Sequence, residues 1–359
     1  MAPPFVPGLE LAGAYYAEVV RPLLDEAFAG LPYAAALIDA GSEVLGFDTE
    51  RSTDHDWGPR LQVLLADDGP PGLAAQVGAM LSRRLPAAFH GYPTAFAVTR
   101  RPGEPGRPQV DVADVGRWLR GQLGFDPRLP VSTADWLATP TQRLAEITGG
   151  AVFHDGAGDL SRARARLAWY PRDVWLYVMA GQWQRIAQEE AFPGRCAEAG
   201  DELGSALVTA RLARDLMRLV LLMGRRYPPY SKWLGSAFAR LPGAAALGPR
   251  LRAAVAATGW AVREQNLSRA YRLVAAQHNE LGITEPLDPS TRPYFNRPFQ
   301  VLGAGRFAEA LRAEITDSEL GSRPPFGAVD GFIDSSDALG HAEFLRAVIA
   351  AARPPANGR

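Results

Sequence analysis

The hydrophobic pattern of this chain changes character at about residue 130, and that change constrains the fold more than any other feature. Before it, short apolar runs of strand length alternate with segments of helical periodicity, whereas beyond about residue 140 the periodicity is nearly all helical. The 359 residues are enough for two domains. We therefore expect an α+β protein with a small mixed sheet in residues 1–130 and an all-helical domain in residues 131–359.

Helices and strands are expected in mixed order in the first domain. Its helices should span residues 8–29, 73–84 and 115–123, and its strands residues 33–39, 60–66, 96–99 and 109–112. The long helices of the second domain should span residues 172–190, 197–224, 244–257, 260–279, 305–315 and 338–352. Gly303-x-Gly305 precedes one of these helices, but no second strand completes a βαβ unit around it, so we interpret it as a helix-entry turn.

The composition is that of an ordinary globular protein. Hydrophobic residues make up 47% of the chain and charged residues 21%, and the formal net charge is −1. Because this balance argues against a large basic face, neither nucleic acid nor a membrane is an expected partner. Cys196 is the only cysteine, which excludes an internal disulfide. The N-terminus lacks the features of a signal peptide and no apolar run has the length of a membrane span, so we expect a cytoplasmic protein.

One dense polar stretch, GSEVLGFDTERSTDHD from Gly41 to Asp56, stands between two expected strands. The Gly41-Ser42 turn allows backbone N–H groups to approach phosphate oxygens. Asp54 and Asp56, at a spacing of two, point to the same side of an extended segment, where two carboxylates can hold a divalent metal ion. The stretch therefore predicts a site where a metal ion is held against a phosphate group.

A third carboxylate is expected on a neighbouring strand. Asp111 alternates with Val110 and Val112, so its side chain should point away from this apolar pair. In that position it could complete the metal site or remove a proton from an incoming hydroxyl group. Asp114 is the alternative, but its place where strand gives way to helix suits an N-cap better.

The order Gly41-Ser42, then Asp54-x-Asp56, then Asp111 on a later strand resembles the signature of the DNA polymerase beta-type nucleotidyltransferase superfamily. Within that superfamily, a small sheet domain followed by a helical domain is similar to the antibiotic nucleotidyltransferases of the kanamycin and lincosamide type. The segments GFDTERSTDHDWGPRL, GDELGS and YPPYSKW also look like a bacterial family of the superfamily known mainly as a domain of unknown function. This closer resemblance spans most of the chain and implies a fold and a reaction type, but no substrate.

The resemblance implies roles for the residues of the motif. Ser42 and the backbone of Gly41 would contact a nucleoside triphosphate, and Asp54 and Asp56 would bind two Mg²⁺ ions that bridge its phosphates. Asp111 would bind the second ion, act as the base toward the acceptor hydroxyl group, or do both. Positioning and neutralisation of charge carry most of the acceleration in such a transfer.

Lys232 is the single lysine among 38 basic residues, in a chain where arginine otherwise replaces lysine. A lysine that has not been replaced by arginine is a candidate for a position that requires a compact ammonium group. The resemblance implies that Lys232 reaches the triphosphate from the helical domain. Near it, Tyr230 is a candidate to stack on the base or bind a phosphate, and in the polar stretch Arg51 is a candidate to contact a phosphate. The alternative is a structural turn in which the aromatic residues around Lys232 pack in the core.

The function expected from the sequence is a magnesium-dependent transfer of a nucleoside monophosphate from a nucleoside triphosphate to a hydroxyl group of a small-molecule acceptor, with release of pyrophosphate. ATP is the default donor because it is abundant. Two alternative acceptors, RNA and a protein hydroxyl group, stay open. A non-catalytic regulator that binds nucleotide is the alternative of a different class.

Overall fold

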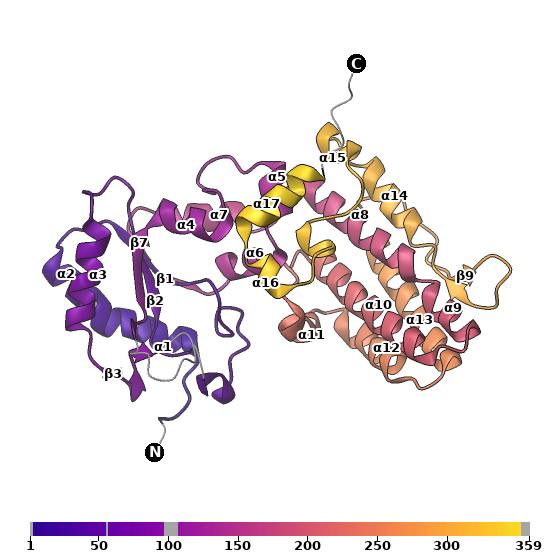
Figure 1. The fold of residues 1–359 in the computed structure, drawn as a ribbon, viewed down its shortest axis with the longest axis horizontal. Coiled ribbons are helices and arrows are strands. Elements are labelled where there is room, and N and C mark those ends of the chain that lie inside the picture. Colours follow the sequence, from indigo (N-terminus) through magenta and orange to yellow (C-terminus); the bar gives the residue numbers. More distant parts are fainter. Residues whose placement is uncertain (1–2, 55–56, 97–106, 353–359) are drawn as a thin grey trace. The chain divides into compact units, whose positions relative to one another are not determined.

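The computed structural model describes residues 3–54, 57–96 and 107–352. It has the expected α+β architecture, with one four-stranded mixed sheet and many helices (Figure 1). The chain forms two compact units, which we describe separately. The first contains Met1–Val131 and Arg143–Ala168, and the second contains Ser132–Gln142 and Trp169–Arg359. The sequence predicts domains of residues 1–130 and 131–359, and the packing additionally groups the segment 143–168 with the first unit.

The sheet of the first unit has the strand order β7-β2-β1-β8. Strand β1 (Tyr33–Leu37) pairs antiparallel with β2 (Leu61–Leu65) and with β8 (Ala151–Asp155), whereas β7 (Val110–Asp114) is parallel to β2. Both central strands are buried along their whole length, as expected for strands covered on both faces. The sheet is therefore mixed, as predicted.

Helices cover the two faces of this sheet. The helix α1 (Gly8–Tyr15) continues through a π-helical turn (Tyr16–Val20) into α2 (Arg21–Ala27), and together with α3 (Leu73–Arg84) it packs on one face of the sheet (Figure 1). The opposite face contacts α4 (Val115–Leu123), while α7 (Asp159–Leu167) packs on β8. The shorter elements of this unit are the 3-10 helix η2 (Glu50–Asp54), β3 (Ala88–Phe89), β4 (Tyr92–Pro93), β5 (Ala95–Phe96) and β6 (Arg107–Pro108).

Strand β8 was not expected, because the sequence beyond residue 140 predicts only helices. It is short, and two glycines, Gly149 and Gly150, separate it from the preceding helix α6 (Thr141–Thr148). Gly150 has a φ of +62°, and its N–H donates to the carbonyl of Val44 at 2.8 Å, so the turn delivers the chain to the free edge of β1. The expected strand at residues 96–99 lies outside the described residues, except for the part that belongs to β5.

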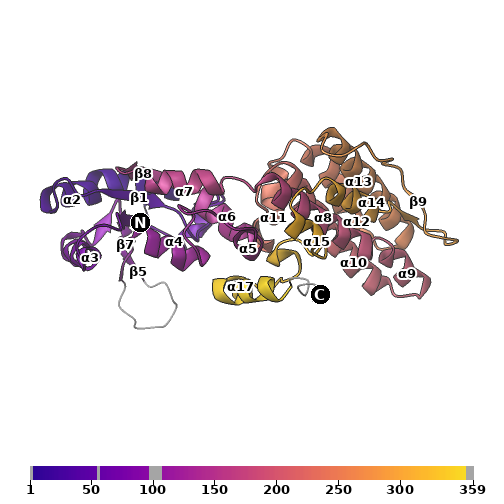
Figure 2. The ribbon, with the colours of Figure 1, turned by 90° about the horizontal axis from the view of Figure 1, so that it is seen from above.

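The second unit is built from helices, with one two-stranded ribbon, β9 (Arg292–Pro293) and β10 (Gln300–Val301). Helix α8 packs on α10 and α14, and α10 also packs on α12 and α13 (Figure 2). The helices of this unit are α5 (Thr133–Ala138), α8 (Arg172–Glu189), α9 (Phe192–Glu198), α10 (Glu202–Met223), α11 (Ser231–Ala239), α12 (Ala244–Ala256), α13 (Trp260–Glu280), α14 (Gly305–Ala313), α15 (Ser318–Ser322), the 3-10 helix η3 (Val329–Gly331), α16 (Ser336–Leu339) and α17 (Ala342–Ala351). Helix α6 spans the boundary between the units.

The turn before α14 is held by a buried carboxylate. The N–H groups of Leu302, Gly303 and Ala304 all donate to Glu190, at 2.7, 3.1 and 2.9 Å. Burial raises the pKa of Glu190, and these three hydrogen bonds oppose that rise. Since the N–H groups of the Gly303-x-Gly305 turn are already bound to a carboxylate of the protein, the turn is a helix entry, as predicted.

No helix among the described residues is both long enough and apolar enough to span a membrane.

His278 is a buried, neutral histidine in the core of the second unit. Its Nδ1 accepts a hydrogen bond from Trp183 Nε1 at 3.2 Å, so Nε2 carries the proton and lies 3.1 Å from Thr284 Oγ1. The side chain is fully buried, and burial lowers its pKa to about 4. Protonation would charge the ring and remove the acceptor that Trp183 requires.

We expect the folded protein to lose stability as the pH falls from about 6.5, the usual histidine pKa, toward 4. In that window the unfolded chain binds a proton at His278 that the folded chain does not, which lowers the free energy of unfolding by up to about 3 kcal/mol. His278→Asn keeps an acceptor but does not titrate. Urea unfolding of both proteins at several pH values should show the difference in stability narrowing as the pH falls, and a constant difference would contradict the prediction.

Candidate functional site

Three segments of the first unit meet at one edge of its sheet, the edge formed by the ends of the strands, where β1 ends and β2 and β7 begin. Gln62, near the start of β2, lies opposite Ala36 of β1 and opposite Asp111 of β7. Because β1 runs antiparallel to β2 while β7 runs parallel to it, the end of β1 and the starts of β2 and β7 lie at the same edge. The loop that follows β1 and the segment that precedes β2 therefore begin and end beside Asp111.

The predicted site residues Gly41, Ser42 and Asp111 all belong to this edge. Asp54 is the last residue of η2, seven positions before β2 begins, but its side chain and the residue Asp56 lie outside the described part of the chain. Arg51 lies in η2 and is exposed to solvent. The structure thus brings the Gly41-Ser42 turn and Asp111 to the same edge.

The Gly41-Ser42 turn is backed by an arginine. Gly41 has a φ of +150°, and a Cβ atom at this position would lie 2.2 Å from Arg60 Nη2. A side chain at position 41 would therefore have to displace Arg60 and also Glu43, whose Oε2 would lie 2.7 Å from the Cβ atom, so both the φ of this residue and a contact within the protein favour glycine. Beyond the turn the chain curls tightly, with Phe47 N donating to the carbonyl of Ser42 at 2.8 Å and Gly46 N donating to that of Glu43 at 2.9 Å.

Two residues that the sequence argument did not single out hold this turn. Arg60 donates from Nε and Nη2 to Glu43 Oε1, at 2.8 and 2.6 Å, and Nη2 also donates to the carbonyl of Ala40. Gln62 Oε1 accepts from the N–H of Ile38 at 3.1 Å, where β1 ends. The position of Arg60 immediately before β2 is the one feature of the sequence that could have pointed to it. Its partner Glu43 is 17 residues away, and no local pattern connects the two residues.

Asp111 lies on the side of β7 away from the main core. Val110 and Val112 pack against the core cluster beneath α1 and α3, while Asp111 is exposed, as the alternation predicts. Partial desolvation of its carboxyl group raises its pKa, the neighbouring charge of Asp39 adds to the rise, and a hydrogen bond with the side chain of Trp118 opposes it. Burial and the charge of Asp39 therefore both disfavour the charged form of Asp111.

Asp39, one residue beyond Ile38 at the end of β1, is a further carboxylate at this edge. Its φ of +89° is uncommon for a residue other than glycine and costs about 1–3 kcal/mol. The carboxylate forms an ion pair with Arg143 and lies 3.5 Å from Gln122 Nε2. Arg143 in turn lies 3.1 Å from Glu146 Oε2. The sequence places residue 39 at the end of an expected strand and gives no reason to expect its ion pair with Arg143, which is 104 residues away.

Asp114 occupies the N-cap position of α4, as its alternative interpretation suggests, but its side chain forms no capping hydrogen bond. Instead, Asp67 Oδ1 accepts from the N–H of Gly116 at 3.0 Å and caps the helix from outside.

Tyr230 and Lys232 belong to the second unit. Tyr230 is the N-cap residue of α11, and its N–H donates to Gln142 Oε1 at 2.9 Å. Lys232 is exposed, and its Nζ lies 4.9 Å from the centroid of the Trp233 ring. Lys232 lies in the first turn of α11, which begins at Ser231 after Pro228 and Pro229.

The described residues contain no group of three histidine, cysteine or acidic side chains that could hold a metal ion. Of the predicted metal ligands, Asp56 and the side chain of Asp54 lie outside the described residues. Of the predicted ligands only Asp111 has a described side chain, and within the described residues no cation forms an ion pair with it.

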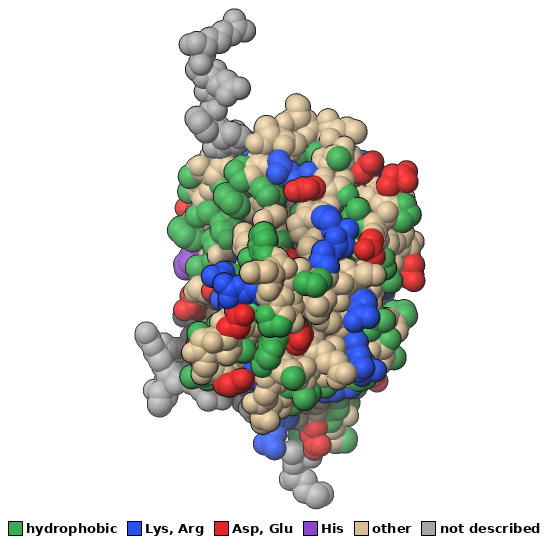
Figure 3. Space-filling model, turned by 90° about the vertical axis from the view of Figure 1, so that its right-hand side faces the viewer, with side chains coloured by type: hydrophobic (Ala, Val, Ile, Leu, Met, Phe, Trp, Pro, Cys, Tyr) green, Lys and Arg blue, Asp and Glu red, His purple; other side chains and the backbone are tan. Residues whose placement is uncertain are grey.

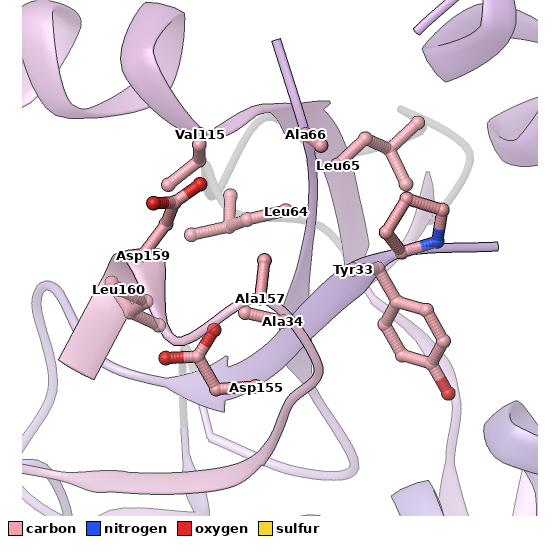
Figure 4. Close-up of a pocket in the computed structure, with 11 residues that line it drawn as sticks. Tyr33, Ala34, Leu64, Leu65, Ala66, Val115, Asp155, Ala157, Asp159 and Leu160 are labelled. Carbon is pink, nitrogen blue, oxygen red and sulfur yellow. The ribbon is translucent and has the colours of Figure 1, made fainter. Parts of the chain in front are cut away.

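A shallow pocket lies at the other end of the same strands. It is enclosed by the start of β1, the end of β2 and the first residues of α4 and α7, and Figure 4 shows its mainly apolar lining together with the carboxylates of Asp155 and Asp159. Both carboxylates have structural partners, because Asp155 Oδ2 accepts from the N–H of Ser161 at 2.7 Å and Asp159 forms an ion pair with Arg162 at 2.6 Å. None of the predicted site residues lines this pocket.

Comparison with protein families matches residues 136–234 to one described as Domain of unknown function (DUF4037). The match runs from α5 into α11 and includes Tyr230 and Lys232, whereas Gly41, Ser42 and Asp111 lie outside it. This agrees, for this part of the chain, with the resemblance to a family of unknown function, and the match itself names no reaction. Among curated proteins, none matches this chain.

We expect Gly41→Ala to destabilise the first unit more than Gly30→Ala does. Both positions have a positive φ, but a Cβ atom at Gly30 would meet no atom within 4 Å, so Gly30→Ala should cost only the backbone strain of about 1–2 kcal/mol. Gly41→Ala should cost about 1–3 kcal/mol more, because the methyl group displaces Arg60. Urea unfolding measures both changes, and equal losses would show that Arg60 does not crowd the turn.

Proposed function

We propose that the protein is a magnesium-dependent nucleotidyltransferase of the DNA polymerase beta-type superfamily. It transfers a nucleoside monophosphate from a nucleoside triphosphate, ATP by default, to a hydroxyl group of a small-molecule acceptor. The observation that carries the proposal is the meeting of the Gly41-Ser42 turn, the segment that leads into β2 and Asp111 at one edge of the sheet. A nucleotidyl transfer requires a phosphate-binding turn and carboxylates within reach of one another.

The charges at this edge fit a divalent cation. Asp111 is exposed and has no cationic partner among the described residues, and desolvation raises its pKa, to which the charge of Asp39, itself paired with Arg143, adds. Carboxylate oxygens are the ligands that Mg²⁺ prefers in proteins. When bound by Asp54, Asp56 and Asp111, Mg²⁺ supplies charge neutralisation at the phosphate oxygens of the substrate.

The roles of the chain's own groups follow from the transfer. The acceptor oxygen forms a bond to the α-phosphorus, the bond from this phosphorus to the bridging oxygen breaks, and pyrophosphate leaves with that electron pair. Backbone N–H groups at Gly41 and Ser42 orient the phosphates, together with Arg51. The hydroxyl proton passes to Asp111 if this residue is the base, and Asp111 serves as a metal ligand, as the base or as both.

A small-molecule acceptor suits the distribution of charge better than RNA does. The net charge is −1, and on the face drawn in Figure 3 basic, acidic and hydrophobic side chains are interspersed. A protein hydroxyl group as acceptor and a nucleotide-binding regulator remain outcomes that the following experiment distinguishes.

We expect pyrophosphate release that depends on Mg²⁺ and on one of the four nucleoside triphosphates, assayed with a panel of hydroxylated acceptors. Asp54→Asn should abolish turnover, and Asp111→Asn should lower kcat by about 100-fold or more. Asp68→Asn, an exposed aspartate beyond the other end of β2, is the matched control and should retain full activity. Wild-type protein that binds no nucleotide would refute the proposal, and binding without turnover would favour the regulator.

We expect Lys232→Ala to raise the KM for the triphosphate about tenfold, since it removes a point charge from the phosphates. Lys232→Arg should recover only part of this loss, because a planar guanidinium group does not replace a compact ammonium group. Arg252→Ala, which removes an exposed charge from α12, is the control. An unchanged KM in Lys232→Ala would leave Lys232 with a role at the surface of α11 only.

A further inference from the structure

We propose that Arg60 is a positioning residue whose buried ion pair with Glu43 fixes the Gly41-Ser42 turn. The effect of Arg60 on phosphate binding rests on the function proposed above. Its contacts with the turn do not depend on that function.

The guanidinium group of Arg60 bridges both ends of the turn. On one side Nη2 donates to the carbonyl of Ala40, the residue before Gly41, and on the other Nε and Nη2 donate to the carboxylate of Glu43, the residue after Ser42. Because Arg60 directly precedes β2, the sheet fixes the backbone from which this side chain extends, and the hydrogen bonds to Glu43 and Ala40 hold its guanidinium group. The planar group therefore fixes the two residues that flank the Gly-Ser pair relative to the first strand residue, Leu61.

Because the side chain of Glu43 is buried, Glu43 needs the positive charge of Arg60. The side chain of Glu43 is 2% exposed and that of Arg60 is 17% exposed, so the pair is little screened by solvent. Without Arg60, the carboxylate of Glu43 would be left charged inside the protein and would have to move toward water. Such a movement would pull on the turn, since Ser42 precedes Glu43 directly.

The donors of Arg60 also distinguish its role from that of a phosphate ligand. The groups Nε and Nη2 are directed at Glu43 and Ala40, so these two groups already have acceptors within the protein, and a Cβ atom at position 41 would have to displace both Arg60 and Glu43. Arg60 thus acts through the backbone of the turn rather than through contact with substrate.

A second set of contacts holds the segment between Glu43 and Arg60 independently. Asp48 Oδ2 accepts from the N–H of Gly8, the first residue of α1, at 2.7 Å, and Trp57 Nε1 donates to the same oxygen at 3.3 Å. The indole ring of Trp57 is 7% exposed and packs on Phe5 and Tyr92, at centroid distances of 5.7 and 5.1 Å. The pair Asp48–Trp57 therefore lies between Glu43 and Arg60 in the sequence, and loss of the pair Glu43–Arg60 should loosen the turn without breaking the contacts of Asp48 with Gly8 and Trp57.

The test combines hydrogen exchange with nucleotide kinetics in the full-length protein. In Arg60→Ala we expect the amides of Gly46 and Phe47, whose acceptors are the carbonyls of Glu43 and Ser42, to exchange at least about tenfold faster than in the wild type. Exchange at the first residues of α1, which Asp48 caps, should stay unchanged. The KM for the triphosphate should rise about tenfold while kcat changes by less than about threefold, and Arg60→Lys should give intermediate values in both measurements.

Arg128 provides the matched control. Its ion pair with Asp126 is buried to a similar degree, with side chains 20% and 5% exposed, but it lies with Asp67 beyond the other end of β2. Arg128→Ala should lower global stability without affecting exchange at Gly46 and Phe47 or the KM. If Arg60→Ala does not fold, Arg60→Lys and Glu43→Gln decide the question by the same two measurements.

Wild-type exchange at Gly46 and Phe47 in a folded Arg60 variant would overturn the proposal, as would equal acceleration in Arg128→Ala. Faster exchange with an unchanged KM would overturn its link to phosphate binding. Should the wild-type protein bind no triphosphate, the proposed function fails, while the exchange measurement still decides whether Arg60 holds the turn.

Discussion

The register of β2 between its two neighbours is the constraint on which the candidate site depends. Gln62 pairs with Ala36 on one side and with Asp111 on the other, and its side chain also binds the N–H of Ile38. A shift of one residue between β2 and β7 would turn Asp111 toward the core cluster beneath α1 and α3, and a shift between β1 and β2 would move Gln62 away from the N–H of Ile38. The packing of Val63, Val110 and Val112 in the core fixes the register, so the hydrophobic core determines which carboxylate stands at the edge.

Much of the fold could be predicted from the sequence because its signals are local. The helices at residues 73–84 and 115–123 have the predicted bounds, and the strands β1, β2 and β7 lie where short apolar runs predict them. Strand β8 was missed because all of its residues are only partly buried and its place in the sheet depends on β1, which precedes it by more than a hundred residues. Periodicity alone contains no information about such a distant partner.

The candidate site could be predicted only in part, for a related reason. The Gly-Ser turn and the alternation around Asp111 can be recognised from neighbouring residues. In contrast, the pair Arg60–Glu43 and the network of Asp39 with Arg143 join positions that no short motif connects. Arginine is the common element of these contacts. One guanidinium group can bind several acceptors at once, as Arg164 also does with the carbonyls of Ile147, Thr148 and Gly149 at the end of α6.

The position of β8 has a consequence for the order in which the protein folds. Neither unit is one continuous length of chain, because residues 132–142 belong to the second unit and residues 143–168 to the first. During synthesis, the sheet cannot be completed until Asp155 has been made, and until then β1, although it can pair with β2, has no partner on its other side and is a buried-type strand at the edge of the sheet. A nascent chain of about 150 residues therefore exposes a template for wrong pairing, which disappears only when the ribosome has passed β8.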